Sequence, residues 1–101
     1  MWLMVMFDFP VVAPNERKAA AGFRKGLLNL GFEMTQFSVY VRFCGSPGQA
    51  VALCGRIKKK LPDSGNVQIL QLTDKQYERA ICYHGRQRQG RRKSPDPFAL
   101  F

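Results

Sequence analysis

The sequence has few acidic residues, a single histidine and no long apolar run. It contains 7 Asp and Glu residues against 16 Lys and Arg residues, which gives its 101 residues a net charge of +9. The longest apolar run covers residues 1–7, whereas a membrane-spanning helix needs roughly 20 residues. The first cation is Arg17, so the basic region of a secretory signal peptide is missing and we expect a cytoplasmic protein.

Cysteine and histidine are too few and too scattered for a disulfide framework or a zinc site. Cys44, Cys54 and Cys82 are odd in number and lack a Cys-x-x-Cys spacing. His84 lies two residues from Cys82, but two ligands do not complete a tetrahedral zinc site. We therefore expect reduced, mostly buried thiols. Because His84 has no recognisable partner, nothing supports catalysis by a nucleophilic side chain.

The excess of cations is the main feature of the composition. With 46% hydrophobic and 23% charged residues, the chain is typical of one globular domain and not of a disordered protein. A charge of this sign favours a polyanionic partner, either nucleic acid or an anionic membrane surface. Since no run is long enough to cross a membrane, we favour nucleic acid and expect no membrane association.

The hydrophobic pattern predicts alternating strands and helices. An apolar strand over residues 1–9 precedes a helix that begins at Pro14 and stops at Gly31. Residues 37–43 alternate as a strand, and a second amphipathic helix precedes a strand over residues 67–72. Residues 77–83 fit a strand or a short helix equally well. The inward residues are expected to be Ala19, Phe23, Leu27 and Leu30 in the first helix and Ala50, Leu53, Ile57 and Leu61 in the second helix. In the second strand, Phe37, Val39, Val41 and Phe43 are expected on one face, and Ser38, Tyr40 and Arg42 on the other.

This order predicts an α+β fold of the ferredoxin-like type. Its βαββαβ arrangement is an antiparallel sheet with both helices on one face. We expect a core domain over residues 1–83 and a tail over residues 84–101, whose first part is basic and whose last four residues, 98–101, are apolar. A terminal apolar segment of this length suits a short strand that covers a sheet edge of its own or a second subunit, which favours a homodimer.

Four segments resemble the CRISPR-associated Cas2 family in order and spacing. They are the strand ending in Phe-Asp-Phe-Pro at residues 7–10, the helix start at residues 16–18, Gln-Phe-Ser-Val-Tyr at residues 36–40, and the strand and turn at residues 71–77. Residues 98–101 are similar to the last strand of some members. The resemblance covers essentially the whole chain. In one departure, Phe7 stands where many members have Tyr, so a phenolic hydroxyl is absent there.

The resemblance implies a role in CRISPR adaptation, the acquisition of spacers. It implies a homodimer that binds duplex DNA by its backbone and bridges two dimers of the Cas1 integrase. It also implies a Mg²⁺-dependent endonuclease, acting on single-stranded RNA or duplex DNA, in which Asp8 is the catalytic residue and the metal ligand. The alternative is a ferredoxin-like dimer that binds nucleic acid or regulates without catalysis.

Asp8 is the only acid in the first fifteen residues. One carboxylate holds Mg²⁺ weakly, but a two-fold dimer that brings two copies of Asp8 together would pair their carboxylates. The structural alternative is an aspartate that accepts backbone N–H bonds from the loop after the strand.

Five arginines are the expected contacts to nucleic acid. A guanidinium group matches phosphate oxygens in two-point geometry, and such contacts position a duplex without reading its bases. The alternative for each is a solvated surface charge. The five are Arg17, Arg24 and Arg42 in the core and Arg86 and Arg88 in the tail.

Overall fold

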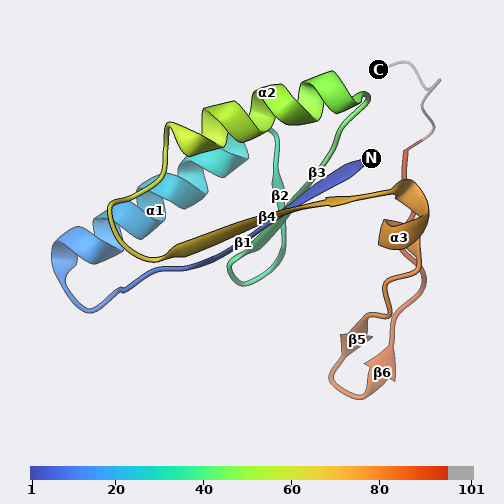
Figure 1. Cartoon of the computed structure of the whole chain (residues 1–101). Helices are drawn as coiled ribbons and strands as arrows, with labels where there is room; N and C mark the ends of the chain where they lie inside the picture. The colour runs from blue at the N-terminus through green and yellow to red at the C-terminus, as the bar shows by residue number, and fades with distance from the viewer. Residues whose placement is uncertain (96–101) are drawn as a thin grey trace.

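An antiparallel sheet of four strands forms the centre of the protein, whose computed structural model describes residues 1–95 (Figure 1). Its strand order is β2-β3-β1-β4, and helices α1 and α2 both cover one face (Figure 1). The predicted ferredoxin-like βαββαβ order is confirmed. The elements are β1 (Trp2–Asp8), α1 (Pro14–Asn29), β2 (Glu33–Gln36), β3 (Val39–Phe43), α2 (Pro47–Lys58) and β4 (Asn66–Leu72).

The strand predicted over residues 37–43 is wrong at its start. Phe37 and Ser38 form the turn of a hairpin between β2 and β3, and β2 was not predicted at all. Ser38 has a φ of 64°, which sequence periodicity does not register, because alternation continues through a turn of two residues. Phe37 consequently points into solvent, with 83% of its surface exposed.

The strand register decides which residues enter the main core. Leu3, Val5 and Tyr40 lie on the helix-covered face, where they pack against residues of α1 and α2 such as Leu27 and Ile57. The predicted alternation of β3 is confirmed, because Val39, Val41 and Phe43 share one face and Tyr40 lies on the other. The register shows that the face with Tyr40 is the one covered by the helices.

The ends of the helices follow from capping groups. The carboxylate of Glu16 accepts a hydrogen bond from the backbone N–H of Ala13 at 2.7 Å, which compensates for the missing hydroxyl at the cap. Gly31 follows α1 with a φ of 85°, as predicted for a glycine that stops a helix. Two expected inward residues lie outside the core: Ala19 is exposed, and Leu61 is 45% exposed because α2 already ends at Lys58.

The segment after β4 is neither a strand nor a helix throughout residues 77–83, because a short helix ends at Glu78 and a strand begins at Tyr83. Thr73 caps α3 (Asp74–Glu78), and a small hairpin of β5 (Tyr83–His84) and β6 (Gln87–Arg88) follows. The strand expected at residues 98–101 lies outside the described residues, and the division at residue 83 remains a prediction. Within residues 1–95, no helix is both long and apolar enough to span a membrane.

An aromatic cluster attaches the tail to the open face of the sheet, the face that α1 and α2 leave uncovered. The rings of Trp2 and Tyr77 stack at 3.8 Å, and the Arg92 guanidinium lies 4.8 Å from the centre of the Tyr77 ring. The indole N–H of Trp2 donates to the Ser94 hydroxyl at 2.7 Å, and Arg92 also donates to the Thr35 hydroxyl. The tail is therefore fastened to β1, β2 and α3 as far as Ser94.

We expect Tyr77 to make the protein sensitive to alkali. Burial raises the pKa of Tyr77 above its ordinary value, and the charge of Arg92 opposes this only in part. The unfolded chain therefore loses this proton first, so the stability contributed by neutral Tyr77 is present below about pH 10 and is lost as the pH rises through the folded pKa. In urea unfolding across this range, Tyr77→Phe should lose less stability than the wild type. Equal losses of stability in the two proteins would show that Tyr77 is not the cause of the sensitivity to alkali.

Candidate metal and nucleic-acid site

Asp8 is the last residue of β1 and lies at the edge of the open face. Its cross-strand neighbour on β4 is Asn66, and the side chains of directly opposite residues lie on the same face of a sheet. Asp8 is exposed although most of β1 is buried. Within residues 1–95 its carboxylate accepts no hydrogen bond, so the loop contacts of the structural alternative are not formed there. The carboxylate is free to bind a ligand.

Two hollows meet at Asp8. The open-face hollow, of about 430 Å³, is lined by Asp8 with Met6, Phe7, Asn66, Val67 and Gln68. The α1-side hollow, of about 240 Å³, is lined by Asp8 with Phe7, Phe9, Val11, Ala20, Arg24, Phe37 and Ser38. The chain therefore brings two predicted site residues, Asp8 and Arg24, to one place. Sequence analysis did not place Asn66, Phe37 or Ser38 there, because Asn66 comes from β4 and the other two from the turn between β2 and β3, both distant from Asp8 in the sequence.

Gly65 holds the backbone at Asp8 in place. It has a φ of 95°, and a Cβ atom added to it would lie 2.3 Å from Cδ1 of Phe9 and 2.8 Å from the carbonyl oxygen of Asp8. Only glycine permits both this conformation and this close approach. The contact of Gly65 with the end of β1 follows from the tertiary structure alone.

The donor set at Asp8 fits a weakly held Mg²⁺ ion. Asp8 supplies a carboxylate, and its cross-strand neighbour Asn66 carries an amide oxygen on the same face. Mg²⁺ is commonly bound by one or two carboxylates, with water and substrate phosphate as the other ligands. In the described part of the chain, no three His, Cys, Asp or Glu residues gather as a metal cluster. One subunit therefore offers at most a partial site.

The five candidate arginines are in different situations. Arg17 donates to the carbonyl oxygens of Val11 and Val12, so its guanidinium supports the loop before α1. Arg42 is half-buried against Gly31, where a Cβ atom would lie 2.9 Å from its Nε. Arg24, Arg86 and Arg88 are exposed. The structure separates these three, because Arg24 lies on α1 whereas the β5–β6 hairpin extends away from the sheet and helices (Figure 1).

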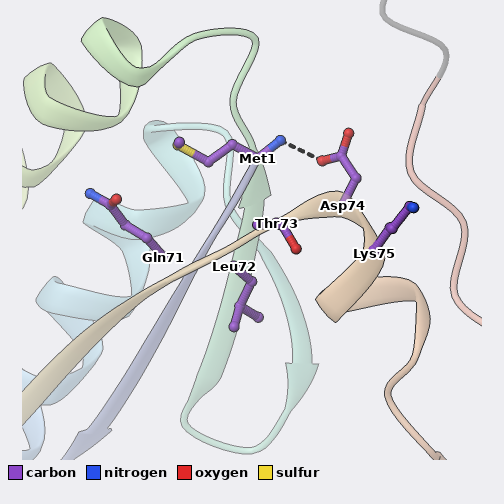
Figure 2. Close-up of a pocket in the computed structure, with 6 residues that line it drawn as sticks. All are labelled: Met1, Gln71, Leu72, Thr73, Asp74 and Lys75. Atoms are coloured by element: carbon purple, nitrogen blue, oxygen red, sulfur yellow. Dashed lines mark hydrogen bonds and ion pairs between the residues drawn. The ribbon is translucent and has the colours of Figure 1, made fainter.

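A third hollow, at the other end of β1, offers no free acidic group. It measures about 530 Å³ and lies between the start of β1 and the junction of β4 with α3 (Figure 2). Its one carboxylate, that of Asp74, forms an ion pair with the amino nitrogen of Met1 (Figure 2). The contact joins the start of β1 to α3, so this carboxylate is already paired.

Comparisons with known proteins identify the family and agree with the fold. A family model described as CRISPR associated protein Cas2 matches residues 1–80. The chain is 58% identical to a CRISPR-associated endoribonuclease Cas2 of Paracidovorax avenae, over all of this chain and 94% of the relative. It is 44% identical to one of Parvibaculum lavamentivorans over the full length of both. A crystal structure of Streptococcus pyogenes Cas2 at pH 6.5 has the same fold, with a TM-score of 0.64 and 19% identity over 83% of this chain and 100% of that one.

Proposed function

Because the chain belongs to the CRISPR-associated protein Cas2 family, we propose that it acts in CRISPR adaptation as a homodimer that binds duplex DNA by its backbone and bridges two dimers of the Cas1 integrase. The observation that carries duplex binding is the β5–β6 hairpin. It exposes Arg86 and Arg88 on a projection, and residues 84–93 contain no acid. Contacts from arginine to phosphate are independent of base sequence, as acquisition of arbitrary spacers requires.

The open face of the sheet supports the proposed homodimer. Met4 and Leu70 lie side by side on it across β1 and β4, and neither α1 nor α2 covers them (Figure 1). Val41, beside Met4 on β3, is already buried with Trp2 and Tyr77. An apolar surface of this kind is a typical interaction site, and a second copy of the chain presents the same surface. A dimer would carry a net charge of about +18, twice that of one chain, which strengthens attraction to DNA.

The second part of the proposal is a Mg²⁺-dependent endonuclease centred on Asp8. Relatives named endoribonucleases favour RNA as its substrate. When bound, Mg²⁺ would lower the pKa of a bound water and neutralise charge on the scissile phosphate. Asp8, with its partner copy in a dimer, would hold the ion, and Arg24 would bind a phosphate of the substrate in the α1-side hollow. The alternative, a dimer that binds nucleic acid without catalysis, is favoured by the single carboxylate.

Duplex binding is tested by its dependence on salt. In the proposed homodimer, the double variant Arg86→Gln with Arg88→Gln removes four arginines. The magnitude of the slope of log K against log salt concentration should therefore fall by about 3.6 if both subunits contact the duplex, since each lost phosphate contact removes about 0.9. The loss of affinity should be the same for unrelated sequences. Gln87→Ala, in the same hairpin but uncharged, should leave the slope unchanged. An unaltered slope in the double variant would exclude the hairpin from the interface.

A further inference from the structure

The α1-side hollow has the features of a binding site for part of a nucleic acid chain. It is the more enclosed of the two hollows at Asp8. Its volume of about 240 Å³ lies below the roughly 300 to 1,000 Å³ of sites that enclose a whole small ligand. It therefore suits one unit of a longer molecule that continues beyond the hollow.

The side chains around this hollow match the parts of a nucleotide. Phe7 and Phe9 stack at 5.2 Å and form an aromatic wall, and Phe37 stands at the rim with 83% of its surface in solvent. Arg24 supplies a cation, and within residues 1–95 its guanidinium forms no hydrogen bond or ion pair, including with Asp8. An aromatic ring beside an unpaired arginine is the usual combination for an unstacked base and its phosphate.

The backbone holds Phe37 in this exposed position. The preceding strand β2 and the following strand β3 meet at the turn, and the carbonyl oxygen of Ser38 accepts a hydrogen bond from the N–H of Phe7 at 3.1 Å. Ser38 adopts a φ of 64°, which costs energy for any residue other than glycine. A strained turn that is bonded to β1 and exposes a large aromatic ring next to Asp8 is a feature of binding sites and does nothing for the core.

We propose that the α1-side hollow binds one unpaired nucleotide of a single strand, with its base against Phe37 and its phosphate on Arg24, next to Asp8. This inference rests on the proposed nuclease function and makes its substrate specific. A base inside a duplex is already stacked and cannot lie against Phe37, so the hollow selects single-stranded RNA over duplex DNA. Duplex DNA would be bound elsewhere, by the hairpin cations.

Binding without catalysis tests the proposal. Fluorescence anisotropy in EDTA would compare a labelled eight-nucleotide single-stranded RNA with a labelled duplex DNA. Phe37→Ala should weaken binding of the RNA about 5- to 150-fold, the range for loss of one stacked base, and change duplex affinity less than 2-fold. Phe37→Trp should retain RNA binding. Val51→Ala, another exposed apolar residue but on α2, is the matched control and should bind both probes as the wild type does.

Three results with Phe37→Ala would overturn the inference. The first is an unchanged affinity for RNA, and the second is an equal loss of affinity for RNA and for duplex DNA. The third is loss of the dimer in sedimentation, which would show that Phe37 contacts the second subunit. Arg24→Gln gives a second measurement and should weaken RNA binding more than Arg56→Gln, whose arginine is exposed on α2. Failure of the proposed function gives a different pattern, in which the wild type binds no duplex or shows no Mg²⁺-dependent cleavage, whatever residue stands at position 37.

Discussion

Gly65→Ala should lower the melting temperature by about 8 to 32 °C. An alanine at a φ of 95° costs about 1 kcal/mol in backbone strain, and forcing its methyl group against Phe9 and the Asp8 carbonyl adds about 1 to 3 kcal/mol. In a domain of this size each kcal/mol corresponds to about 4 to 8 °C. Calorimetry at a fixed protein concentration is the appropriate measurement, because dimer formation makes the melting temperature depend on concentration.

Two other glycines separate the causes of this effect. Gly85 also has a positive φ, of 61°, but an added Cβ would meet nothing within 4 Å, so Gly85→Ala should show the backbone cost alone. Gly90 has neither feature, and Gly90→Ala should melt close to the wild type. If Gly65→Ala melted like Gly85→Ala, the contact with Phe9 and Asp8 would be relieved without cost and our account of Gly65 would be wrong.

Asp8→Ala should abolish Mg²⁺-dependent cleavage of RNA while leaving dimerisation and most duplex binding intact. The loss of cleavage activity should exceed the roughly 10- to 100-fold that follows removal of a residue hydrogen-bonded to a metal ligand, because Asp8 is the proposed ligand itself. Asp8 is exposed and makes no hydrogen bond within residues 1–95, so its removal should change the free energy of unfolding by no more than about 0.5 kcal/mol. Cleavage assays with and without EDTA measure the Mg²⁺-dependent activity. Sedimentation measures dimerisation, and fluorescence anisotropy measures duplex binding.

Asp63 provides the matched control for this experiment. It is an exposed aspartate in the loop before β4 that lines neither hollow at Asp8, so Asp63→Ala should cleave RNA normally. Full activity of Asp8→Ala would place the metal elsewhere and favour the alternative of a dimer that binds nucleic acid without catalysis. Loss of cleavage together with loss of dimer in a folded Asp8→Ala protein would contradict the separation of the two roles.

Much of the fold could be predicted because it depends on local patterns. The apolar run of β1, the stripe of Phe23 and Leu27, and the stop at Gly31 are each read within one element. The β2–β3 hairpin was missed because its turn contains Phe37 and Ser38 in place of the glycine or asparagine that usually marks such a turn.

The sequence by itself determined the ferredoxin-like fold class, the excess of positive charge and Asp8 as the acid at the end of the first strand. Only the tertiary structure decided what surrounds Asp8. Asn66 reaches it through the register of β4, Arg24 through the packing of α1, and Phe37 through a strained turn bonded to Phe7. Periodicity records which residues can be buried within one element. The meeting of residues 8, 24, 37 and 66 depends on register, strain and packing between elements, which are set when the whole domain folds.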